Sequence, residues 1–223
     1  MATDPPGVTA PRWRSRRSAA VAGIVFAVLL IAALVMIRLA LSGADLEQVE
    51  TDAGRRNLVR VALNIVPFAG IAFLWFIGVV RDQLGEVEDR LFSTVFLGSG
   101  LLFLAMLFQG AVTATTLAQM IPGEHLDAGL WTFGRGTTET LVSVYAMRMA
   151  AVFTLSVSTV ALRTAAVPRW VPFSGYTVAV VLLVASGTHK WAQLLFPAWV
   201  LVLSVAILLT PGRQHSASGT TAG

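Results

Sequence analysis

The sequence predicts an all-α fold, a polytopic transmembrane helical bundle with six spans. Of its 223 residues 56% are hydrophobic and only 13% are charged, whereas soluble domains carry about 25% charged residues. Several apolar runs reach about 20 residues, the length that crosses a hydrocarbon core of about 30 Å at about 1.5 Å per residue. With so many spans, almost nothing is left for a soluble domain, and the lipid bilayer is the expected surrounding.

The first span is expected over residues 19–37, ending near Leu41. This run is longer than the 7–15 apolar residues of a signal peptide, so we expect it to stay in the protein. Residues 1–18 before it are rich in Pro, Thr, Ser and Arg and predict a disordered basic tail. The membrane domain then covers residues 19–210, and residues 211–223 form a second disordered tail.

Five further apolar runs complete the predicted bundle. Pro67 and Pro197 fall inside spans, where neighbouring helices can satisfy the freed carbonyls, and Pro172 falls at the start of a span, where proline is tolerated. No internal repeat is visible, so the pattern gives no support to an inverted-repeat transporter. The five runs cover residues 58–80, 91–120, 141–162, 171–186 and 191–210.

Lys and Arg in the loops predict the orientation, because acidic residues contribute little to the positive-inside rule. Nine arginines fall on the side of the two termini and six basic residues on the other. A basic run such as Arg12–Arg17 can also indicate nucleic acid, but beside an apolar run it is typical of a cytoplasmic topology signal. We therefore expect both termini in the cytoplasm and no nucleic-acid partner.

The stretch VVRDQLGEVEDRLF at 79–92 concentrates charge between two apolar runs. Arg81 is expected at the end of one helix, and Glu86, Glu88 and Asp89 at the start of the next, where these charges complement the helix dipoles. Gly85 between them is a plausible helix stop. A docking surface for a cytoplasmic partner and weak divalent-metal binding are the alternatives.

Arg148 is the ionisable residue expected deepest in a span, and such residues are functional candidates. By helical rise, Asn64 and Thr113 fall at a similar depth of about 10 Å from the outer side. Gln109 and Thr113 belong to one polar stripe, and Tyr145 lies one turn from Arg148. These five residues are the predicted ligand-binding candidates, for a small anionic solute or a lipid head group that would suit a guanidinium.

Two structural interpretations compete with that pocket. The arginine stem could extend to the head groups, or the polar side chains could join helices by hydrogen bonds worth about 0.6 kcal/mol each. A small-residue face on the same span predicts close helix packing away from Arg148. That face consists of Ala146, Ala150, Thr154 and Ser158.

No enzyme is indicated by the motifs present. HExxH, GxSxG and Walker A sequences are missing, and the sequence calls for no catalytic residue, metal or cofactor. Glu124, His125 and Asp127 in the predicted outer loop 121–140 are ligand types, but a zinc site needs three or four converging ligands. Gly134 and Gly136 around Arg135 are expected to form a turn in that loop.

Segments of the chain resemble uncharacterised six-span integral membrane proteins of actinobacterial type. The segments are FIGVVRDQLGEVEDRLFSTVFLGSGLLFLAMLF, VYAMRMAAVF and PRWVPFSGYTVAVVLLV, and the similarity runs from about residue 58 to 187. That group has no established activity to carry over. The resemblance implies the six-span layout and a bacterial inner membrane, and leaves the mechanism open.

Three functions remain open from the sequence. The first is binding or transport through an outward-facing polar cavity around Arg148. The second is a structural or accessory membrane subunit without a ligand. The third is a membrane enzyme that acts through the residues of the outer loop.

Overall fold

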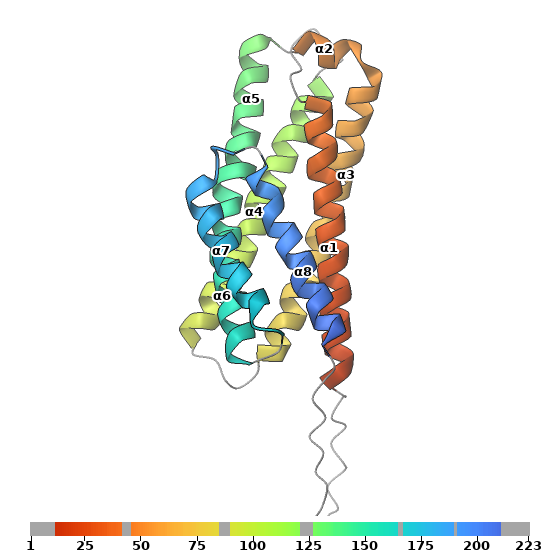
Figure 1. Cartoon of the computed structure of the whole chain (residues 1–223). Coiled ribbons are helices and arrows are strands. Elements are labelled where there is room, and N and C mark those ends of the chain that lie inside the picture. The colour runs from red at the N-terminus through yellow and green to blue at the C-terminus, as the bar shows by residue number, and fades with distance from the viewer. Residues whose placement is uncertain are drawn as a thin grey trace, which may run out of the picture.

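The computed structural model describes residues 12–41, 46–84, 90–120, 127–164, 167–189 and 191–210. These parts of the chain are helical apart from short turns, which confirms the all-α prediction (Figure 1). The elements are α1 (Arg12–Leu41), α2 (Leu46–Thr51), α3 (Ala53–Leu84), α4 (Arg90–Met120), α5 (Ala128–Thr140), the π-helix η2 (Leu141–Ala146), α6 (Met147–Arg163), α7 (Trp170–Ala185), the 3₁₀-helix η3 (Ala192–Leu194) and α8 (Leu195–Leu209).

The helices run along one bundle axis, with α1 beginning and α8 ending at the same end (Figure 1). We call this the terminal end and the opposite one the α2 end. Within the described residues, five helices are long and apolar enough to cross a membrane. α7, with 16 residues, extends about 24 Å, less than the hydrocarbon core. The chain is therefore a helical membrane protein, and the count of six complete spans stays a prediction.

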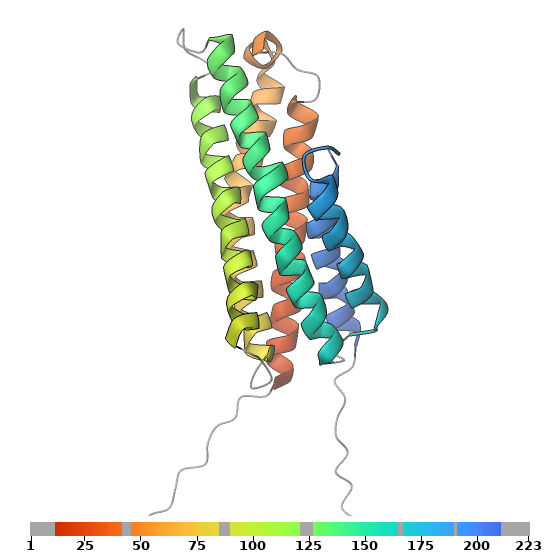
Figure 2. The same ribbon diagram turned by 90° about the vertical axis from the view of Figure 1, so that its left-hand side faces the viewer.

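The bundle is taller at the α2 end than the apolar runs predicted. α5, η2 and α6 form one uninterrupted helical stretch of 36 residues, about 54 Å long. Figure 2 shows that α7 and α8 stop well below the α2 end, where α2, α5 and the start of α3 continue. The upper part of the bundle therefore extends beyond the layer that α7 and α8 cover.

The predicted outer loop 121–140 is wrong over most of its length, because residues 128–140 form α5. Asp127 caps this helix by accepting a hydrogen bond from the Leu130 backbone at 2.6 Å. Gly134 is buried inside the helix and faces Leu117, whose side chain lies 3.0 Å from the position a Cβ would take. This glycine allows close packing of α5 on α4 and forms no turn.

The start of the first span and the charged stretch 79–92 can be compared with the structure only in part, because they adjoin residues that it does not describe. α1 begins at Arg12, ahead of the expected first span. Arg81 lies in the last turn of α3, as expected. Residues 85–89, which include Gly85, Glu86, Glu88 and Asp89, lie outside the described residues, as do residues 1–11 and 211–223.

A cluster of seven buried phenylalanines fills the middle of the bundle. Phe73 of α3 is central to it, with ring centroids 4.6 Å from Phe26, 5.1 Å from Phe103 and 5.1 Å from Phe153. Phe196 of α8 packs on the Phe103 ring at 4.9 Å. Phe76 and Phe96 complete the cluster. α1, α3, α4, α6 and α8 thus meet in one aromatic core.

The predicted small-residue face of α6 is confirmed. Ala146, Ala150, Thr154 and Ser158 are all fully buried. A Cβ at Gly175 of α7 would collide with Ser158 Oγ and would lie 2.7 Å from the ring of Trp199. Small side chains therefore let α6, α7 and α8 approach closely, as van der Waals packing between membrane helices requires.

We expect Gly175→Ala to lower the stability of the folded protein by about 1–3 kcal/mol, the usual cost of overpacking. Ser158 Oγ can rotate away, but Trp199 is buried and its Nε1 donates to the Val171 carbonyl at 3.4 Å. The measurement is the thermal unfolding midpoint in a neutral detergent. Gly98→Ala is the matched control, because no atom lies within 4 Å of its added Cβ; equal midpoints for both variants would contradict the packing argument.

Candidate functional site: a cavity at the α2 end

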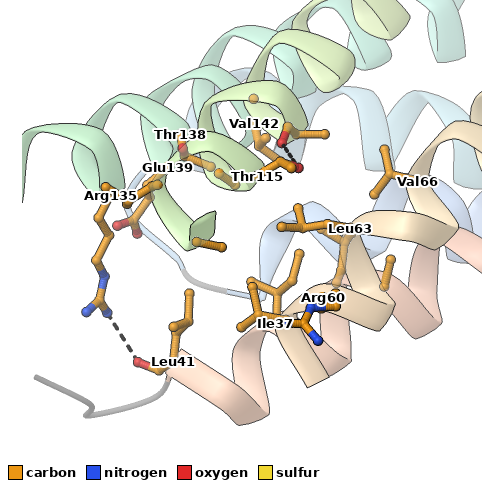
Figure 3. Close-up of a pocket in the computed structure, with 18 of the residues that line it drawn as sticks. Ile37, Leu41, Arg60, Leu63, Val66, Thr115, Arg135, Thr138, Glu139 and Val142 are labelled. Atoms are coloured by element: carbon orange, nitrogen blue, oxygen red, sulfur yellow. Dashed lines mark hydrogen bonds between the residues drawn. The ribbon is translucent and has the colours of Figure 1, made fainter. Parts of the chain in front are cut away.

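A cavity of about 870 Å³ lies between α1, α3, α4 and the α5–η2 stretch. Its lining reaches Leu41 and Val49, at the α2 end of the bundle, and extends inward to Leu30 and Leu107. Figure 3 shows side chains from these helices surrounding it. Its volume falls within the range of small-molecule sites, about 300–1,000 Å³.

The inner part of the cavity is apolar and has a closed floor. Leu30 of α1, Pro67 of α3 and Leu107 of α4 line this part. One or two turns further along the same helices, Phe26 and Phe103 belong to the packed aromatic cluster. The phenylalanine cluster therefore closes the cavity towards the terminal end, and the cavity is a blind pocket in this structure.

The outer part of the cavity is cationic. Among the described lining residues, four are arginines, Arg38, Arg56, Arg60 and Arg135, and one is an acid, Glu139. Apolar walls around charges of one sign focus the electric field and attract ions of the opposite sign. The rim therefore favours anions.

Two arginines at this end have a clear structural task. Arg55 Nη1 donates to the Ala40 carbonyl at 2.8 Å, and Arg135 Nη2 donates to the Leu41 carbonyl at 3.2 Å. Figure 3 shows the second bond. The last four carbonyls of a helix have no partner within it, and cations there also complement the helix dipole. Arg55 and Arg135 thus cap the end of α1.

Asp52 holds Arg55 in place at the start of α3. Its Oδ1 accepts hydrogen bonds from the backbone N–H of Gly54 at 2.8 Å and of Arg55 at 3.2 Å, and its Oδ2 lies 3.3 Å from Arg55 Nε. The Arg55 backbone N–H, foremost among these contacts, holds the pKa of the Asp52 carboxyl below its usual range. This capping keeps its full strength above the ordinary pKa of an aspartate and is lost as the pH falls through the lowered value.

Arg38 belongs to a polar network that joins three parts of the chain. With the Gln193 amide oriented so that its oxygen faces Arg38, Oε1 accepts from Arg38 Nε at 3.1 Å and from Nη2 at 2.9 Å, while Nε2 donates to Ser143 Oγ at 3.2 Å. The guanidinium also lies 5.4 Å from the centroid of the Trp191 ring, within range of a cation–π interaction. α1, η2 and η3 are therefore connected at the level of the cavity.

Arg60 differs from the other rim arginines. Its side chain is exposed and lines the cavity. Among the described residues, its guanidinium has no hydrogen-bond or ion-pair partner; only its backbone carbonyl accepts a bond, from Asn64 Nδ2 at 3.0 Å. Figure 3 shows Arg60 beside Ile37 and Leu63. Its five N–H donors are therefore available to a ligand.

The structure places the five candidates from the sequence apart. Asn64 lines the cavity. Arg148 and Gln109 are exposed and do not line it, and Thr113 donates to the Gln109 carbonyl at 3.0 Å. Tyr145 lies in a separate shallow depression with Phe133. The ligand-binding role of these residues stays a prediction.

Sequence reasoning missed Arg38, Arg60, Arg135, Glu139 and Gln193 as cavity residues. It treated the three arginines as loop or span-end residues that counted only for orientation, and it gave Glu139 and Gln193 no role. One feature of the sequence could have indicated them: several predicted spans carry a charged residue near the end that faces the same side of the membrane. No group of three or more His, Asp or Glu that could hold a metal occurs among the described residues.

Comparison of the chain with protein-family models, with curated proteins and with solved structures finds no match.

Gln193→Leu is expected to lower stability by about 1 kcal/mol, because it removes the acceptor of two Arg38 donors and the partner of Ser143. Hydrogen bonds between membrane helices contribute about 0.6 and at most about 1.7 kcal/mol each. Thermal unfolding in detergent measures the change. Gln109→Leu, the same substitution at an exposed position without a side-chain bond among the described residues, should leave the midpoint unchanged; an equal loss there would refute the network.

Proposed function

We propose that this membrane protein binds a small anionic solute or a lipid head group in the cavity at the α2 end. The observation that carries the proposal is Arg60, an exposed arginine that lines the cavity and whose guanidinium has no partner among the described residues. A guanidinium presents a planar fork that matches carboxylate and phosphate oxygens. The blind floor supports binding in preference to passage through the bundle.

The alternative is a structural or accessory subunit without a ligand, and part of the rim favours it. Arg135 is explained by the capping of α1, and Arg56 by its hydrogen bond to the Val49 carbonyl at 3.4 Å. Arg38 is explained by Gln193 and Trp191. Arg60 has no such contact among the described residues. Arg60 therefore separates the two functions.

The proposal places the chain in a bacterial inner membrane with both termini in the cytoplasm, so that the cavity opens outward. The arginine majority on the terminal side supports this orientation. Lining residues at the end of α1 and at the start of α3 then meet the outer interface. An outward cavity samples external solutes and the lipid of the outer leaflet.

Single cysteines test this orientation, because the chain has none of its own. Cysteine at Ala128, exposed at the start of α5, should react with an impermeant thiol reagent in intact cells. Cysteine at Thr164, exposed after α6, should react only after permeabilisation. The opposite labelling pattern would reverse the orientation, and labelling of both sites from outside would contradict the predicted passage of the helix between them.

Arg60→Gln should weaken anion binding about tenfold or more, the usual effect of losing a charge-assisted hydrogen bond. The probes are inorganic phosphate and lysophosphatidic acid, and the measurement is the concentration dependence of the thermal midpoint in a neutral detergent. Arg163→Gln, at an exposed arginine at the terminal end, is the matched control and should respond like the unmodified chain.

Arg148→Gln in the same assay tests the candidate set from the sequence. Loss of the response in this variant, with Arg60→Gln unaffected, would move the binding site to Arg148. No response of the unmodified chain to either probe would leave the structural alternative.

A further inference from the structure

We infer that the occupant of the cavity is an anionic amphiphile, with an acidic head group at Arg60 and Arg38 and an apolar chain directed towards the phenylalanine cluster. The inference rests on the proposed anion-binding function and specifies its ligand class. It is carried by the polarity of the lining, by the length of the cavity and by its closed inner end.

On both α1 and α3 the lining changes from charged to apolar with distance from the α2 end, although the two helices run in opposite directions. On α1 the change runs from Arg38 back to Leu30, and on α3 it runs from Arg60 forward to Pro67. Because the two helices are antiparallel, their charged residues meet at one level and their apolar residues at another. The gradient therefore belongs to the cavity and not to one amphipathic helix.

The α4 wall repeats this arrangement, since its lining passes from Gln119 at the α2 end to Leu107. The α5–η2 wall is mixed along its length, with Trp131, Arg135, Glu139, Val142 and Ser143 in the lining. Between these levels the α4 wall is mostly small and apolar, with Ala111 and Ala114 facing the cavity. A site for a bare inorganic ion would need only the charged level.

The apolar part is long enough for a short apolar chain. Leu30 and Arg38 are separated by about 12 Å along α1, at about 1.5 Å per residue. This is somewhat less than the thickness of one leaflet of the hydrocarbon core, about 15 Å. The whole cavity, polar level included, extends about 18 Å along α4 from Leu107 to Gln119. A cavity of about 870 Å³ accommodates a head group together with such a chain, whereas a phosphate ion alone would leave the apolar walls unoccupied.

Arg38 also fits the head-group level. It follows directly on the apolar run 19–37, and its guanidinium lies against Trp191. Tryptophan is enriched at membrane–water interfaces. The charged level of the cavity therefore coincides with the interface at which lipid head groups lie, and an amphiphile can bind without changing its depth.

The test uses lysophosphatidic acid with a photoreactive diazirine at the end of its chain, added to the full chain in nanodiscs of neutral lipid. After illumination, mass spectrometry should locate the crosslinks at the inner end of the cavity, around Leu30, Pro67 and Leu107. A monoacylglycerol with the same diazirine but no phosphate should crosslink there about tenfold less, as should the acidic probe with Arg60→Gln, because both lose the charge-assisted bonds of the head group.

Ala111→Phe supplies a second measurement, since a large ring there fills the middle of the cavity. It should abolish the inner crosslinks and leave the stabilisation by inorganic phosphate intact. Val112→Phe is the matched control, because the neighbouring Val112 is exposed and does not line the cavity. The crosslink map of the unmodified chain tests the inference even where Ala111→Phe does not fold.

The remaining outcomes separate the two levels of the proposal. An Arg60-dependent response to lysophosphatidic acid and phosphate, without crosslinks at the inner end or with crosslinks insensitive to Ala111→Phe, would overturn the amphiphile and leave anion binding standing. No Arg60-dependent response to either probe would overturn both.

Discussion

The aromatic packing at the middle of the bundle is the constraint on which the other features depend. Within a membrane the lipid is as apolar as the side chains, so helix association relies on close van der Waals contact. Phe26, Phe73, Phe103, Phe153 and Phe196 provide this contact for the five long spans at one level. Towards the α2 end, α7 ends and α8 begins near this level, so fewer helices pack beyond it (Figure 2). The cavity exists where the aromatic core stops.

The arginines at the α2 end differ in the contacts that their guanidinium groups make, and these contacts indicate which of them have a structural role. A count of arginines suggests a strongly anion-binding surface, yet Arg55 and Arg135 complete the hydrogen bonding of α1. Arg38 is likewise held by Gln193. Such contacts position the guanidinium groups, and a positioned cation also loses less conformational entropy when it meets a ligand. The capping residues therefore shape the wall of the cavity.

The sequence was sufficient for the fold class and for helix packing but insufficient for the site. Long apolar runs predict spans because the bilayer fixes their length, and the four-residue spacing of Ala146 and Ser158 predicts a buried face because helical geometry is local. The cavity depends on which helices become neighbours, and no local pattern determines that. Depth alone grouped Asn64 with Arg148, whereas rotation about the helix axes directs only Asn64 to the cavity. α5 was taken for a loop because it lies between two apolar runs, and its two glycines were interpreted as a turn, although Gly134 serves close packing.

The π-helix at Leu141–Ala146 has a consequence for the phase of the long helix that contains it. A π segment accommodates about one residue more than an α-helix of the same rise, and one residue corresponds to a rotation of roughly 100°. The faces of the helix before and after the π segment are therefore rotated relative to each other, and each part has its own angular register. One register presents Trp131 and Arg135 to the upper bundle, and the other presents Ala150 and Thr154 to the buried core. A single extra residue is enough for one continuous helix to serve both as a membrane anchor and as a wall of the cavity.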